Sequence, residues 1–283
     1  MVRIFWPAVV MTMAAALAAV PTAAQDDVRT DAPEVAVPVI VTATRIEQEA
    51  AESGSSVSIV TAEAIRARGH DEVQEALRTI PGLHVARVGG RGSQTTLFVR
   101  GAETDHAVVM IDGFQINRDG GFFDWGKMFT LGVERVEVVR GAGSAPHGSD
   151  AVSGSINMIL RQGEGDPRAT VSFEGGSFGT YRERLEFDGR VDRFSFALSA
   201  ANLDQTDPRF EHNDLHQSST VGRFDFQFSA DTSVKFDLFL FRDRAEINAA
   251  FVPPLFGPED PNAEREEDQA LTALEGRHRV NDW

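Results

Sequence analysis

The chain has 283 residues, is 42% hydrophobic and carries a formal net charge of −16 at pH 7. This acidity argues against a nucleic-acid partner, because phosphate binding requires clustered Lys and Arg. The complete absence of Cys excludes disulfides, thiolate metal sites and a Cys nucleophile.

The N-terminus has the pattern of a secretory signal. Arg3 precedes an apolar, Ala-rich run over residues 4–20, and Thr22-Ala23-Ala24 supplies small residues before a cleavage site. We expect a signal peptide over residues 1–24, the alternative being a membrane-anchoring helix. The run is interrupted by Pro7 and lies at the bottom edge of membrane-spanning length, which favours the cleaved signal.

Residues 25–43 form a tether that ends in one apolar segment. Residues 25–36 are polar and acidic, which indicates a flexible chain. The segment after them favours an extended conformation, since it is rich in β-branched side chains. It is either a docking strand that adds to another protein's sheet or the first strand of the next domain. Its residues are Val37, Pro38, Val39, Ile40, Val41, Thr42 and Ala43.

Helices and short strands then alternate, which predicts a small α+β domain over residues 44–162. Thr61 is placed to cap a helix that ends at Gly69. Asp71 and Gln74 resemble a capping box for a second helix. Asp112-Gly113 predicts a tight turn between strands. The expected strands cover residues 57–60, 84–88, 96–100, 107–111, 133–139 and 155–160.

After Gly165 the pattern changes to alternation of apolar residues with residues that are mostly polar or small, Phe239 being an exception. Phe194, Phe196 and Leu198 alternate with Ser195, Ala197 and Ser199, and similar runs follow. The alternation fits transmembrane strands with lipid on one face, and it also fits a soluble β-sandwich. We expect tight turns at residues 188–192 and 230–232, and long connections over 204–219 and 245–268. Such alternation of short and long connections favours the membrane barrel.

Several separated motifs follow one another between residues 37 and 160. In order, they are VIVTATRIEQ, ALRTIPGLHV, LFVRG, VVMIDG, VERVEVVRG and HGSDAVSGSIN. With these motifs, most of this stretch resembles the N-terminal portion of TonB-dependent outer-membrane receptors, with the cobalamin-receptor type nearest. The resemblance implies an α+β plug domain followed by antiparallel transmembrane β-barrel strands over residues 166–283, the barrel being incomplete in this chain.

The family resemblance implies a receptor that imports cobalamin or a ferric siderophore through the outer membrane of a Gram-negative cell, and not an enzyme. Residues 37–43 match the TonB box, which would bind the C-terminal domain of TonB. Membrane lipid would surround the strands. The His residues show no metal-ligand spacing, and no nucleophile motif is present.

The resemblance also implies roles for two sets of plug residues. Charged residues that would latch the plug to the barrel wall are Arg100, Glu134, Glu137 and Arg140. Residues at ligand-contact positions are Gln94, Thr96, Glu103, Gly121 and Phe122. From the residues alone, the first set could be solvated surface charges and the second set flexible loops.

One acidic segment could hold a cation. Its carboxylates are Asp204, Asp207, Glu211 and Asp214, and oxygen ligands of this kind suit Ca²⁺. The spacing matches no defined calcium loop, so a solvated acidic loop is the alternative. No other cofactor is expected.

The number of residues after Gly165 limits the number of barrel strands. Only 283 − 165 = 118 residues follow it. Plugged transporters have 22 strands, which at about 10 residues each need about 220 residues. We expect about six strands here and therefore a fragment of a longer product. The alternatives are a non-functional truncated gene product and a soluble periplasmic plug-like binding module.

Overall fold

The computed structural model describes eight segments of the chain, all within one compact unit formed by residues 38–283. The expected signal peptide and most of the tether lie outside them. The described residues are 40–41, 48–49, 56–88, 91–117, 123–141, 151–206, 214–246 and 264–280.

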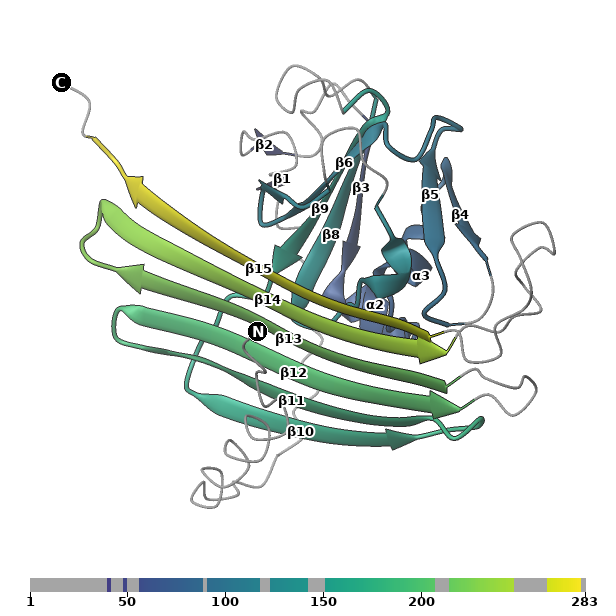
Figure 1. The fold of residues 1–283 in the computed structure, drawn as a ribbon. Helices are drawn as coiled ribbons and strands as arrows, with labels where there is room; N and C mark the ends of the chain where they lie inside the picture. Colours follow the sequence, from purple (N-terminus) through teal and green to yellow (C-terminus); the bar gives the residue numbers. More distant parts are fainter. Residues whose placement is uncertain are drawn as a thin grey trace, which may run out of the picture. The chain divides into compact units, whose positions relative to one another are not determined.

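The first part of the chain forms the expected α+β domain, here called the plug (Figure 1). Its central sheet has the order β3-β8-β9-β6-β7, and β4 and β5 form a separate hairpin. Within the central sheet only β6 and β9 run parallel. The strands are β3 (Ser56–Thr61), β4 (Leu83–Arg87), β5 (Thr95–Val99), β6 (Ala107–Ile111), β7 (Phe114–Gln115), β8 (Val133–Arg140) and β9 (Gly154–Leu160).

Two helices and one 3-10 turn cover this sheet and close its core. They are α2 (Ala62–Ala67), α3 (Val73–Leu77) and η1 (Trp125–Lys127). Val73 and Leu77 of α3 are fully buried and pack with Val136 and Ile156 of the sheet. Burying an aliphatic side chain of this size stabilises the fold by about 1.5–3 kcal/mol.

Local sequence signals explain where these elements begin and turn. Thr61 caps α2 by accepting the backbone N–H of Ala64, as predicted. The capping box of α3, however, is formed by Glu72 and Glu75, so the prediction of Asp71 and Gln74 was wrong by one position. Asp112 and Gly113 both have positive φ angles, 47° and 84°, and join β6 to β7 in the expected turn.

The second part of the chain forms an antiparallel meander, here called the wall (Figure 1). Six strands are described, as the residue count predicted, and the sheet they form is open. They are β10 (Arg168–Gly175), β11 (Tyr181–Val191), β12 (Phe194–Thr206), β13 (Asp214–Gln227), β14 (Thr232–Glu246) and β15 (Glu264–His278).

The connections of the wall differ in part from the prediction. The tight turn expected at residues 188–192 is wrong in extent, because β11 continues to Val191. The connection expected over 204–219 is also shorter, since β12 reaches Thr206 and β13 begins at Asp214. β10, β12 and β14 end at one end of the sheet, here called the loop end. Short turns join β11 to β12 and β13 to β14 at the opposite end, here called the turn end.

The two faces of the wall differ in the way a membrane barrel requires. Phe173, Phe236 and Leu274 expose their side chains, whereas Ser199, Asp237 and Asp243 are buried on the other face, beside the plug. A soluble sandwich would bury the apolar face instead. The arrangement is that of transmembrane β-barrel strands, with the apolar face outward.

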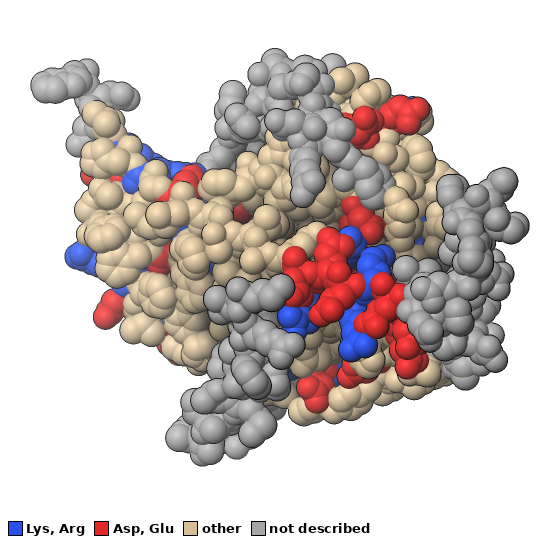
Figure 2. Space-filling view, viewed as in Figure 1, with Lys and Arg blue, Asp and Glu red and all other residues tan. Residues whose placement is uncertain are grey.

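The outward apolar band ends sharply toward the loop end. Along β14 the outward positions run from Val234 through Leu240, and then Arg242 and Arg244 follow. Both arginines form ion pairs with exposed carboxylates of β15. Figure 2 shows Lys, Arg, Asp and Glu gathered most densely over this end of β14 and β15. Across the described ranges, no helix is both long and apolar enough to cross a membrane.

Candidate functional site

The candidate site is the contact between the plug and the inner, polar face of the wall. Part of this contact is apolar. Val221, Phe239 and Phe241 of the wall belong to the same buried cluster as the plug core, and the rings of Phe129 and Phe241 lie 5.8 Å apart. The plug is therefore docked on the wall by apolar packing as well as by charges.

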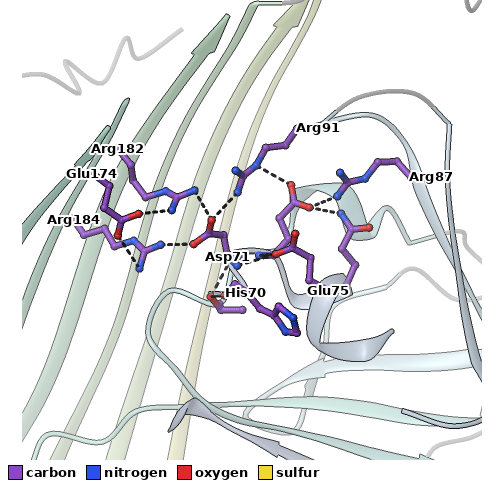
Figure 3. A network of polar contacts seen from close by, with 11 residues as sticks. His70, Asp71, Glu75, Arg87, Arg91, Glu174, Arg182 and Arg184 are labelled. Atoms are coloured by element: carbon purple, nitrogen blue, oxygen red, sulfur yellow. Dashed lines mark hydrogen bonds and ion pairs between the residues drawn. The ribbon is translucent and has the colours of Figure 1, made fainter. Parts of the chain in front are cut away.

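Asp71 is the centre of a charged cluster near the loop end, the Asp71 cluster (Figure 3). Its carboxylate lies 2.6 Å from Arg182 Nη2 and 2.5 Å from Arg184 Nη2, both on β11. Arg91 of the plug approaches the same carboxylate at 3.4 Å. One aspartate thus joins two wall arginines to one plug arginine.

The neighbouring Glu72 organises the plug side of this cluster. Its side chain is 1% exposed and accepts hydrogen bonds from Gln74 Nε2 at 2.7 Å and Arg91 Nε at 3.2 Å, and another from Arg87. Glu72 also begins α3. A buried carboxylate without partners is costly, and these three donors satisfy Glu72. The hydrogen bond from Arg91 to Glu72 also holds that arginine beside Asp71.

A second set of contacts surrounds a cavity of about 660 Å³ between the plug and β15, here called the loop-end cavity. Lys127 forms ion pairs with Asp124 of the plug, at 3.5 Å, and with Glu267 of the wall. Arg265 donates to the backbone oxygen of Gly92 at 2.6 Å and pairs with Asp243. Both cations of this lining are therefore held by neighbours.

The remaining lining of the loop-end cavity is amide or apolar, apart from one further carboxylate. Its further lining residues are Gln94, Ile116, Asn117, Phe123, Met128, Phe239, Asp268, Gln269, Ala270 and Leu271. Asp268 is engaged by Arg242 at 2.6 Å, on the outer side of the wall. The cavity can accept a bulky ligand that offers apolar surface and hydrogen bonds.

A third cluster, the Asp112 cluster, lies toward the turn end. Asp112 accepts the backbone N–H of Leu160 at 2.9 Å and lies 3.3 Å from Arg223 Nη1. Lys235 Nζ is 3.9 Å from Asp112 and 3.0 Å from Glu275. Burial raises the pKa of the Asp112 carboxyl, against the opposing effect of Arg223 and Lys235.

Three of the four predicted latch residues have side-chain contacts within the plug, among the described residues. Arg140 donates to Ser58 Oγ at 2.6 Å and to Pro81 O. Glu137 is fully buried and pairs with Arg135 at 2.8 Å. Glu134 lies 4.0 Å from Arg161, which in turn pairs with Glu186 of the wall at 2.8 Å. Arg100 is exposed, with a positive φ of 53°. A latch role for these four stays a prediction.

The plug–wall ion pairs of the described residues use other plug side chains, and sequence reasoning missed them. Asp71, Asp112, Lys127 and Arg161 supply the plug side. The wall side was signalled in the sequence, because charged residues at inward positions alternate with outward apolar ones. Their plug partners gave no local signal, since each pair joins residues far apart in the chain.

Three of the five predicted ligand-contact residues lie in segments that the structure describes. Gln94 is exposed and lines the loop-end cavity. Thr96 donates to Ala86 O at 3.2 Å within the β4–β5 hairpin, and Glu103 lies on an exposed loop. Gly121 and Phe122 lie outside the described residues.

The acidic segment predicted for calcium is only partly described. Asp204 pairs with His216 Nδ1 at 2.5 Å, and the backbone N–H of Asp214 donates to Glu246. Asp207 and Glu211 lie outside the described residues. Within the described segments, no group of three acidic or imidazole side chains could hold a metal ion.

Two residues of the predicted TonB box form a strand. Ile40–Val41 is β1, which pairs antiparallel with β2 (Gln48–Glu49). The other five residues of the segment, Val37, Pro38, Val39, Thr42 and Ala43, lie outside the described residues. A docking role for this segment stays a prediction.

Comparison with known proteins gives a family match for the plug. Residues 49–155 match the family model described as the TonB-dependent Receptor Plug Domain. The chain is 34% identical over 139 residues to the vitamin B12 transporter BtuB of Vibrio vulnificus, covering 49% of this chain and 23% of that protein. It is 38% identical over 145 residues to BtuB of Photobacterium profundum, covering 51% and 24%.

Solved structures support the same fold for the plug and wall together. The ferripyoverdine receptor of the outer membrane of Pseudomonas aeruginosa gives a TM-score of 0.63 at 20% identity, over 73% of this chain and 28% of that one. The siderophore receptor PirA of Acinetobacter baumannii gives 0.60 at 18% identity, over 80% and 38%. The chain spans about a quarter of the length of the curated relatives described above.

Proposed function

We propose that this chain, which carries the plug domain of a TonB-dependent receptor and the first strands of its wall, serves in energised import across the outer membrane. The wall strands would stand in lipid, and the plug would close the passage until it is displaced. The relatives named above are transporters and receptors, and the function proposed is transport and not catalysis.

One observation carries this proposal: the wall buries its charged face against the plug and exposes its apolar face. Phe173 and Leu274 are 67% and 70% exposed, whereas Asp243 is fully buried on the opposite face. In lipid, outward apolar side chains are favourable, and inward charges can bind a removable domain. A plug held by ion pairs can be displaced because water replaces those partners as they separate.

For the ligand we propose cobalamin ahead of a ferric siderophore. Lys127 and Arg265, the two cations that line the loop-end cavity, are already paired. Of the carboxylates that line it, Asp124 and Glu267 pair with Lys127, and Asp268 pairs with Arg242. A polyanionic ferric chelate would therefore have to compete with carboxylates for the cations of this lining, whereas cobalamin offers amides and apolar surface. The BtuB relatives are named as vitamin B12 transporters.

The energy input would come from TonB acting on residues 37–43. A short extended segment can pair with the sheet of a partner through backbone hydrogen bonds. β1 uses one of its edges for β2, and its other edge could take the partner strand. A pull applied there would reach the plug through the chain that enters β3.

Ligand binding to the full-length receptor that carries these residues tests the proposal. Purified receptor in detergent would be titrated with cyanocobalamin and, separately, with a ferric catecholate chelate. We expect saturable cobalamin binding that Gln94→Ala weakens by about threefold to tenfold, equal to about 0.7–1.4 kcal/mol. Gln227→Ala, at the turn end, is the matched control and should leave binding unchanged. Binding of the ferric chelate but not of cyanocobalamin would overturn the choice of cobalamin as ligand. Binding of neither compound would overturn the proposed receptor function.

A further inference from the structure

The Asp112 cluster holds more buried acid than its cations can neutralise. Asp112 of the plug and Asp225 and Asp237 of the wall face only Arg223 and Lys235 in its buried part, among the residues that the structure describes. At the edge, Glu275 also takes Lys235, and Arg277 of β15 pairs with Glu275 at 3.2 Å. Three carboxylates therefore compete for two cations.

Asp237 is the least well paired of these carboxylates. It is 5% exposed, and neither of its oxygens has a hydrogen-bond partner in the part of the chain that the structure describes. Its nearest cation is Lys235, at 3.5 Å. The same ammonium lies 3.9 Å from Asp112, so the two aspartates share one lysine. Two ionised carboxylates in one buried site repel each other, which favours retention of a proton.

Asp112 and Asp237 lie on opposite sides of the plug–wall contact, so a proton bound by either of them affects docking. Asp112 stands in the turn between β6 and β7 of the plug, and Asp237 stands on β14 of the wall. Lys235 also lies 5.3 Å from the ring of Phe114 in the same plug hairpin. Repulsion between the two aspartates therefore acts directly across the plug–wall contact.

We propose that the Asp112–Asp237 pair is a proton-sensitive clamp, which tightens the docking of the plug on the wall when it takes up a proton and loosens it when the proton leaves. When one aspartate of the pair is neutral, the other aspartate and Asp225 match the two cations Arg223 and Lys235. When both are ionised, three carboxylates share these two cations. The clamp acts through the plug–wall contact alone and is independent of which ligand is transported.

The direction of the pH effect follows from proton linkage. Burial raises the pKa of Asp112 in the docked plug, and undocking returns this carboxyl to water and its ordinary range. The docked state then binds more protons than the released state. Docking is strongest below the ordinary aspartate range and weakens as the pH rises through the raised pKa.

The test is the unfolding equilibrium of the plug in the full chain, held in detergent micelles, between pH 5 and pH 8. Urea unfolding would be followed by the fluorescence of the buried Trp125. Asp237→Asn should lower the unfolding constant relative to the parent chain by up to about tenfold at pH 8, and the two should converge toward pH 5. Asp112→Asn should flatten the same pH dependence, because the two carboxylates that remain, Asp225 and Asp237, then match the two cations.

Asp243→Asn is the matched control, since Asp243 is also fully buried on β14 but is paired with Arg265. That change should raise the unfolding constant at pH 8, opposite in sign to Asp237→Asn. A ratio between Asp237→Asn and the parent chain that stays constant with pH, or a less stable Asp237→Asn protein at pH 8, would overturn the clamp.

Discussion

Single residues decide how strongly the plug is held. Asp71 is one carboxylate with three arginine neighbours, two from the wall and one from the plug. Exposed ion pairs are worth little, but Arg182 is 9% exposed, so on loss of Asp71 it keeps its pair with Glu174 at 2.8 Å without recovering full hydration. The same reasoning explains why Glu72 is surrounded by donors. A buried charge is tolerated where hydrogen bonds replace water.

Asp71→Asn should loosen the plug, because the change keeps the shape of the side chain and removes its charge. We expect a loss of about 2 kcal/mol in the free energy of plug unfolding, less than for a fully buried pair. Urea unfolding followed by Trp125 fluorescence would measure it. Asp105→Asn, a partly exposed aspartate whose neighbour is His106 at 3.9 Å, is the control and should change little. Equal stability of both variants would contradict a holding role for Asp71.

At the scale of elements, the sequence predicted local structure well and long-range pairing poorly. Thr61 and the Asp112-Gly113 turn were predicted because a cap and a tight turn depend on neighbours in the chain. The capping box was misplaced because Asp71 with Gln74 and Glu72 with Glu75 have the same spacing, and the distant arginines of β11 engage Asp71 instead.

The extent of β11 was misjudged for a related reason. Asp188-Gly189-Arg190 has the composition of a turn, yet these residues continue the strand. Asp188 points to the polar inner face, where Arg168 pairs with it at 2.9 Å. A polar, turn-like sequence is therefore a weak signal for the end of a strand in a sheet whose buried face is itself polar.

The candidate site was predictable only in part. Gln94 could be placed at the site by resemblance, but Lys127 and Arg265 required the folded structure.

Gly154 tests how tightly the plug sheet is packed. A Cβ added there would lie 2.2 Å from Val139 O on the neighbouring strand, and its φ is 152°. Gly154→Ala should therefore destabilise the plug by about 2 kcal/mol or more, through overpacking and backbone strain. Gly175→Ala on β10, where nothing lies within 4 Å, should stay within about 0.5 kcal/mol of the parent chain. Similar losses for both glycines in urea unfolding would contradict this packing.

At the scale of the whole molecule, the two faces of the wall meet different surroundings. The outward face of the wall is apolar up to Leu240 and charged from Arg242 onward, which suits a boundary between lipid and water. The inward face offers charges to a domain that must be held and then moved. Ion pairs at both ends of the contact, at Asp71 and Asp112, give a plug that is fixed in place without a continuous apolar seal.

The most direct measurement is the uptake of labelled cobalamin by cells that lack their own transporter and express the full-length receptor carrying these residues. We predict uptake that requires TonB and that Ile40→Pro abolishes while surface binding remains, because proline removes a ladder donor from the docking segment. Ser53→Ala, outside that segment, is the control and should leave uptake intact. Cobalamin uptake without TonB, or undiminished uptake by Ile40→Pro, would contradict the account.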